Sequence, residues 1–252
     1  MQQDFIYGEE HELHGRVYDL AQPLHLGFRS WEEVLQHDDA HYVWLVDTRL
    51  AALGQRVESL NLVLGMLNTD ALPESFQDFP ISRLDWLKIT TDVFLARLIS
   101  IGDCAALLVN EIFQTGLSER GCNREQLRKK GIDRDILMIL SHLEMSDSPL
   151  RLERNSRFHH GFERPYSQDY DAFRIAATFE HAGHGIGGTD RLGRPIDVET
   201  LFLEAVNHLK HEVLETFSRL GPDLETLYDK LLPRFNVTFR TLRRNGKPLP
   251  WE

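Results

Sequence analysis

The sequence predicts an all-α protein, and three observations carry that prediction. Apolar residues recur every three to four positions over long stretches, as they do on one face of a helix. Credible strands are few, and no alternation of strands and helices is present. Capping patterns, prolines and glycines mark where the predicted helices begin and end. We expect a helical bundle built on two long antiparallel helices, with a short polar helix and a C-terminal helical pair.

The first long helix is predicted over residues 42–68. Its apolar residues keep a heptad spacing throughout, which is typical of a core-facing bundle helix. A short helix over residues 31–37 is expected before it, because Ser30 and Glu33 have the spacing of a capping box. The stripe of the long helix consists of Val43, Val46, Leu50, Leu53, Val57, Leu60, Leu64 and Leu67.

The second long helix is predicted over residues 82–116, after a loop at residues 73–80. A modest loop between two long helices favours an antiparallel hairpin. The apolar stripe of this helix consists of Leu87, Phe94, Leu98, Ile101, Ala105, Leu108 and Ile112.

Shorter helices are predicted in the middle of the chain. Asp133 is the expected N-cap of a helix that continues through Met145. Ser148 as N-cap and Pro149 in the first turn predict the next helix, which ends at Gly161 and is unusually polar. Ser167 is the expected N-cap of a helix over residues 168–182.

A glycine-rich loop over residues 183–196 follows, and it can act as a lid over the polar helix. The C-terminal region has apolar residues at helical spacing before and after Gly221-Pro222. Because proline lacks an N–H and crowds the preceding turn, we expect one helix to end there and another to begin. These two helices form the predicted C-terminal pair.

Length and charge narrow the function classes. The 252 residues suffice for one domain over residues 1–252, with an acidic N-terminal extension at residues 1–40. The net charge is −11, and residues 1–80 alone carry −10. This balance excludes a protein that coats nucleic acid broadly. Two cysteines, no secretory signal and no apolar membrane span favour the cytoplasm and no membrane partner.

The most informative segment is RNSRFHHG, residues 154–161, near the end of the polar helix. Arginine binds phosphate through a planar fork, and histidine exchanges protons near neutral pH. With an asparagine to orient them, these residue types can cleave RNA without a metal. The 2′-hydroxyl attacks the phosphorus, histidine transfers protons, and arginine neutralises the developing charge.

The spacing of this segment leaves two interpretations open. Asn155 and His159 are four residues apart and share a helix face. Arg154 and His159 are five apart, about 140° around a regular helix. They converge if the arginine stem wraps around, if the helix is irregular, or if a second subunit completes the site. The competing interpretation is a solvated helix face whose polar residues only form hydrogen bonds.

Long paired helices followed by a short helix with R-N-x-x-x-H resemble the HEPN superfamily (higher eukaryotes and prokaryotes nucleotide-binding). The segments DVFLARLISIGDCAALLVNEIFQTGL and RNSRFHHGFERPYSQDYDAFRIAATFE are similar to one bacterial branch of it. The architectural resemblance covers about residues 40–240, whereas the motif itself is six residues. It implies an all-α fold, frequent dimers, and metal-independent ribonuclease activity in toxin–antitoxin and antiviral systems.

Residue by residue, the resemblance makes Arg154 the motif arginine, Asn155 the polar position after it, and His159 the motif histidine. Because His160 follows directly, either histidine can be the acid/base. The implied partners are RNA, a second copy of the chain, and an antitoxin or regulatory protein, with no cofactor.

Three further arginines near the motif are expected to hold the RNA backbone by charge, namely Arg151, Arg157 and Arg164.

Two other functions remain open from the sequence. The first is a HEPN-like module that binds RNA or a partner without cutting. The second is a metal-dependent bundle hydrolase that uses His159, His181 and His184, with His160 and Glu180 nearby.

Overall fold

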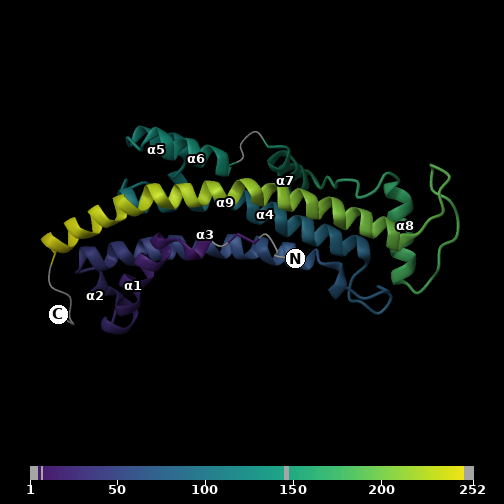
Figure 1. The fold of residues 1–252 in the computed structure, drawn as a ribbon, viewed down its shortest axis with the longest axis horizontal. Helices are drawn as coiled ribbons and strands as arrows, with labels where there is room; N and C mark the ends of the chain where they lie inside the picture. Colours follow the sequence, from purple (N-terminus) through teal and green to yellow (C-terminus); the bar gives the residue numbers. More distant parts are fainter. Residues whose placement is uncertain (1–4, 7, 145–147, 247–252) are drawn as a thin grey trace. The chain divides into compact units, whose positions relative to one another are not determined.

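The computed structural model describes residues 5–6, 8–144 and 148–246, and these form nine α-helices with no β-strand (Figure 1). The all-α prediction is therefore confirmed. Three short 3₁₀ turns lie at Gly8–Glu10, Thr69–Ala71 and Glu119–Gly121, and one isolated bridge joins Thr189 to Pro195. No described helix has both the length and the apolarity that crossing a membrane requires.

Residue contacts divide the chain into two compact units. The first comprises Met1–Phe5, Ser59–Arg97 and Asp147–Phe217, and the second comprises Ile6–Glu58, Leu98–Ser146 and Ser218–Glu252. Three long helices contribute residues to both: α3 (Asp38–Met66), α4 (Arg83–Phe113) and α9 (Val198–Asn245). The single domain over residues 1–252 stays a prediction.

The two long helices predicted from the heptad stripes are present as α3 and α4. Every residue of both predicted stripes is buried. In the second unit, the Tyr42 hydroxyl near the start of α3 donates a hydrogen bond to the Ile112 carbonyl near the end of α4. This contact is the one expected of an antiparallel pair.

The predicted C-terminal helical pair is wrong, because α9 is one helix of 48 residues with Pro222 and Pro233 inside it. A proline inside a helix costs about 3 kcal/mol. On both sides of Pro222, however, the apolar stripe is buried, with Phe217, Leu220 and Leu224 at most 6% exposed. Burial of that continuous stripe outweighs the local cost, so the helix continues where the sequence rule predicts a break.

The first unit also contains α7 (Pro149–His160) and α8 (Tyr170–His181). The predicted bounds of α7 are correct, since the Ser148 side chain accepts from the Leu150 N–H and Gly161 ends the helix in a left-handed conformation. The N-cap of α8 is Asp169 rather than the predicted Ser167, because the Asp169 carboxylate accepts from the Ala172 N–H.

The second unit also contains α1 (Glu12–Gly27), α2 (Trp31–Val34), α5 (Arg124–Lys129) and α6 (Arg134–Glu144). The predicted end of α6 at Met145 lies outside the described residues. Helix α1 was not predicted, because Gly15 and Pro23 interrupt its pattern. It nevertheless buries Leu13, Val17, Ala21 and Leu24 at helical spacing, so part of the acidic N-terminal extension belongs to the core of this unit.

His14 on α1 predicts a pH-dependent stability. Its ring packs edge-on against Tyr228 at 4.9 Å, and its Nε2 is buried without a hydrogen-bond partner in the described part of the chain. Burial, together with the nearby His11, lowers the pKa of His14 from 6.5 to about 4. The unfolded chain therefore takes up this proton first, and stability falls as the pH drops from about 6.5 toward 4.

We expect His14→Phe to remove this component, which amounts to about 2 kcal/mol at pH 5. The measurement is the free energy of urea unfolding at pH 7.5 and pH 5 for both proteins. The variant should lose less stability between the two pH values than the wild type. An equal loss in both proteins would show that His14 is not the group responsible.

Candidate active site

Helix α7 carries the motif and is held to the rest of the first unit mainly by charge. Arg157 is the residue of this helix that is buried, and large apolar side chains such as Leu152 and Phe158 remain exposed, at 66% and 51%. A helix this polar gains little from apolar packing. Its ion pairs therefore decide which of its side chains are available for chemistry.

Arg154 and Asn155 are brought together directly. One terminal nitrogen of Arg154 donates to the Asn155 side-chain oxygen at 3.0 Å. The guanidinium carbon lies 5.3 Å from the centre of the Phe158 ring, one turn further along the helix. The Arg154 Nε is buried and has no hydrogen-bond partner among the residues that the structure describes. The arginine stem thus extends toward the end of the helix that carries the histidines.

His159 and His160 are both exposed, with ring centres 6.5 Å apart and the rings inclined at 65°. Within the described part of the chain, no hydrogen bond joins either histidine to Arg154 or Asn155. The structure thus joins the arginine to the asparagine and leaves both histidines open to solvent.

Arg157 has an intramolecular role. Its side chain is 4% exposed, and its Nε donates to the carboxylate of Asp92 on α4 at 2.7 Å. A second guanidinium nitrogen lies 2.7 Å from the same oxygen, and Glu153 lies one turn earlier at 3.9 Å. Because its guanidinium is buried against Asp92, we do not include Arg157 among the residues proposed to contact RNA.

Arg164 is likewise held inside the fold. It donates two hydrogen bonds of 2.6 Å to Glu153 on α7 and one of 2.7 Å to Glu212 on α9. Its side chain is 14% exposed. Since its guanidinium is bound to Glu153 and Glu212, we do not include Arg164 among the residues proposed to contact RNA either. Arg151, in the first turn of α7, is partly buried and also has an interaction partner in the chain.

These ion pairs explain part of the unusual polarity of α7. Glu153, Arg157 and Arg164 attach α7 to α4 and α9 by charge, which is a structural role. Sequence reasoning missed Asp92 and Glu212 as their partners. The four-residue spacing of Glu153 and Arg157 was the one local signal of an ion pair.

A small pocket of about 90 Å³ opens beside the end of α7. It is lined by Asp92, Arg157, Phe158, Gly161, Phe162 and Glu163. Phe158 and Phe162 are each more than half exposed and lie on either side of the two histidines in the chain. Exposed aromatic rings next to catalytic residue types provide surfaces for a nucleobase or for another protein chain.

Two residues of the alternative metal site, His181 and Glu180, have other partners. The His181 ring nitrogen Nδ1 lies 2.9 Å from the Phe76 carbonyl oxygen, and Glu180 binds the buried Arg83 at 2.8 Å. Among the residues described, no group of three or more His, Cys, Asp or Glu side chains is arranged to hold a metal ion. We therefore do not propose the metal-dependent hydrolase that would use His181 and His184.

The glycine-rich loop after α8 is fixed by two aspartates. Asp190 accepts from the N–H groups of Leu192 and Arg194. Asp169 accepts from the N–H and guanidinium of Arg191, which lowers the pKa of Asp169 to about 2. Because these contacts tie the loop to the start of α8, they do not favour the predicted role as a lid over the motif helix.

In comparisons with known proteins, the chain matches no family model, no curated protein and no solved structure. Family membership therefore stays a prediction that depends on the motif and the all-α architecture.

Proposed function

We propose that this protein is a HEPN-like, metal-independent endoribonuclease whose catalytic groups lie on α7. The observation that carries the proposal is the end of that helix. A hydrogen-bonded Arg154–Asn155 pair is followed, four and five positions after Asn155, by two exposed histidines. Cation, amide and titratable base on one short segment are the groups that phosphodiester cleavage needs.

In the proposed reaction, His159 accepts the proton of the 2′-hydroxyl as its oxygen bonds to the adjacent phosphorus. The bond from phosphorus to the 5′-oxygen breaks, and a protonated histidine donates a proton to the leaving oxygen. Arg154 neutralises the charge that gathers on the phosphorus-bound oxygens, and Asn155 orients Arg154. The products are a 2′,3′-cyclic phosphate and a 5′-hydroxyl.

A homodimer is part of the proposal. Two copies of α7 can supply one histidine from each subunit, one as the base and the other as the acid. The exposed Leu152, Phe158 and Phe162 give the α7 region apolar area for such a contact. The resemblance to the HEPN superfamily also implies a toxin or defence role with a regulatory protein as partner.

The experiment measures cleavage of a single-stranded RNA in EDTA by the wild type, His159→Ala, His160→Ala and His208→Ala. His208 is an exposed histidine on α9 in the same unit and serves as the matched control. We expect His159→Ala to lower the rate by about 10²-fold or more. The other two variants should stay within about threefold of the wild type.

Loss of activity in His160→Ala alone would move the acid/base to that residue. Wild-type protein that binds RNA but leaves it intact would favour the non-catalytic module. An RNA with a 2′-O-methyl group at the cleaved position should resist cleavage, since its attacking hydroxyl is blocked.

A further inference from the structure

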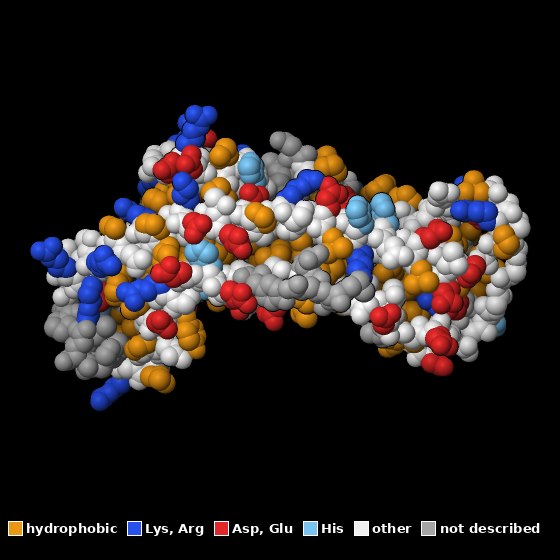
Figure 2. Space-filling view, viewed as in Figure 1, with side chains coloured by type: hydrophobic (Ala, Val, Ile, Leu, Met, Phe, Trp, Pro, Cys, Tyr) orange, Lys and Arg blue, Asp and Glu red, His pale blue; other side chains and the backbone are white. Residues whose placement is uncertain are grey.

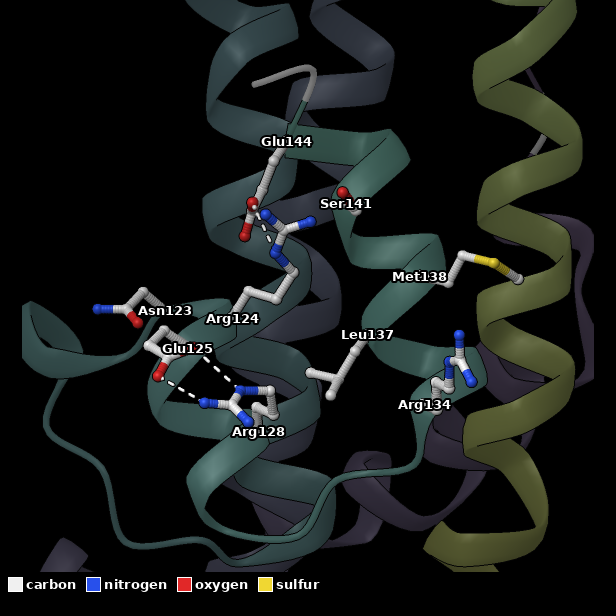
Figure 3. Close-up of a pocket in the computed structure, with 9 residues that line it drawn as sticks. All are labelled: Asn123, Arg124, Glu125, Arg128, Arg134, Leu137, Met138, Ser141 and Glu144. Atoms are coloured by element: carbon white, nitrogen blue, oxygen red, sulfur yellow. Dashed lines mark hydrogen bonds and ion pairs between the residues drawn. The ribbon is translucent and has the colours of Figure 1, made fainter. Parts of the chain in front are cut away.

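A second cavity, apart from α7, lies between α5 and α6 in the second unit (Figure 3). Its volume is about 680 Å³, within the range of small-molecule sites. Three arginines and two glutamates line it, so it carries excess positive charge within a chain of net charge −11. A local cationic pocket in an acidic protein indicates an anionic ligand.

Two of the arginines lie on one face of α5 and are oriented by carboxylates. Arg128 donates from Nε and one terminal nitrogen to Glu125 at 3.0 and 2.9 Å. Arg124 has its Nε 3.4 Å from Glu144 on α6. Among the described residues, the terminal nitrogens of Arg124 have no hydrogen-bond partner. The carboxylates thus hold one edge of each guanidinium and leave the other edge for a ligand.

The opposite wall of the pocket is formed by α6. Figure 3 shows Leu137 extending from α6 into the space between the helices, and the Arg124 guanidinium between Glu144 and Ser141 in this view. The side chain of Met138 is 55% exposed on the same helix. Figure 3 shows Met138 extending away from α5, so Leu137 is the apolar side chain beside the α5 arginines, and Ser141 provides a hydroxyl at one end of this wall.

We propose that this pocket binds a phosphomonoester with a flat or apolar body, such as a nucleoside monophosphate. A phosphoryl group has three terminal oxygens, one more than a carboxylate, and can accept from more than one of the donors that line the pocket, which are Arg124, Arg128 and Ser141. Leu137 contacts the body of the ligand. The proposal is based on the second unit alone and is independent of RNA cleavage by α7.

The test is calorimetric titration of the full chain with AMP, inorganic phosphate and adenosine. We expect AMP to bind more tightly than phosphate, and adenosine to bind least. Arg124→Gln/Arg128→Gln should weaken AMP binding by about tenfold or more, because two charge-assisted contacts are lost. Leu137→Ala should weaken AMP binding but leave phosphate binding unchanged.

Arg120→Gln is the matched control, because Arg120 is exposed nearby in the sequence and does not line the pocket. This control should bind AMP as the wild type does. Circular dichroism on the double variant verifies that it is folded. The proposal is overturned if AMP shows no binding at about 5 mM, the weak end of measurable affinity. It is also overturned if adenosine matches AMP, or if the double variant binds AMP unchanged.

Discussion

Replacing Arg164 with methionine is expected to lower the free energy of unfolding by about 3–5 kcal/mol. The substitution keeps the apolar stem but removes the cation that Glu153 and Glu212 share. Both carboxylates are at most 26% exposed, so neither is fully solvated when its partner is lost. The measurement is urea unfolding of the wild type and the variant at pH 7.

Two further variants test whether the loss of stability is specific to the buried ion pairs of Arg164. Arg174→Met removes an exposed arginine on α8 that lies 3.5 Å from Asp171, and it should cost no more than about 1 kcal/mol. Adding Glu153→Gln to Arg164→Met should restore part of the loss by removing one unpaired charge. Equal destabilisation by the two arginine variants would contradict the role assigned to Arg164.

Gly102→Ala is expected to destabilise the second unit by about 2 kcal/mol, although alanine is the better helix former. Gly102 lies within α4 where α6 approaches closely. A Cβ built on Gly102 meets the Glu144 Cα at 2.7 Å and the Glu144 backbone nitrogen at 2.9 Å. Because these are backbone atoms, relief requires a shift of α6 rather than a side-chain rotation.

The same substitution at Gly15 is the control. A Cβ on Gly15 in α1 meets no described heavy atom from elsewhere in the chain within 4 Å, so Gly15→Ala should leave stability unchanged or raise it by up to about 1 kcal/mol. Both variants are compared by thermal unfolding. A Gly102→Ala protein as stable as Gly15→Ala would mean that α4 and α6 do not approach closely at this point.

Features set by local chemistry were predictable from the sequence. The bounds of α7 followed from Ser148, Pro149 and Gly161, since each acts within a turn of its own position. The stripes of α3 and α4 followed from residue spacing alone. The single helix α9 was not predictable in this way, because the outcome at Pro222 depends on burial of residues on both sides of it.

The candidate site was predicted only in part. The Arg154–Asn155 contact joins neighbouring residues, so the motif itself contained it. The partner of Arg157 is Asp92, 65 positions away in the sequence, and no local pattern indicates that pairing. Arg154, Arg157 and Arg164 look alike in the sequence but differ in the structure. Arg157 and Arg164 bind carboxylates, whereas Arg154 donates to Asn155.

On the face drawn in Figure 2, acidic and basic side chains are interspersed, without a broad area of either sign. This face therefore offers no extended basic track for a nucleic acid. The positive charge that we propose for RNA cleavage is that of Arg154 on α7.

The most direct test of this account is the rate at which the purified wild type and Arg154→Ala/His159→Ala cleave the same RNA in EDTA. The account predicts cleavage by the wild type with 2′,3′-cyclic phosphate ends, and a rate lower by about 10³-fold in the double variant. Equal cleavage by the two folded proteins, or intact RNA with both, would contradict the assignment of catalysis to α7.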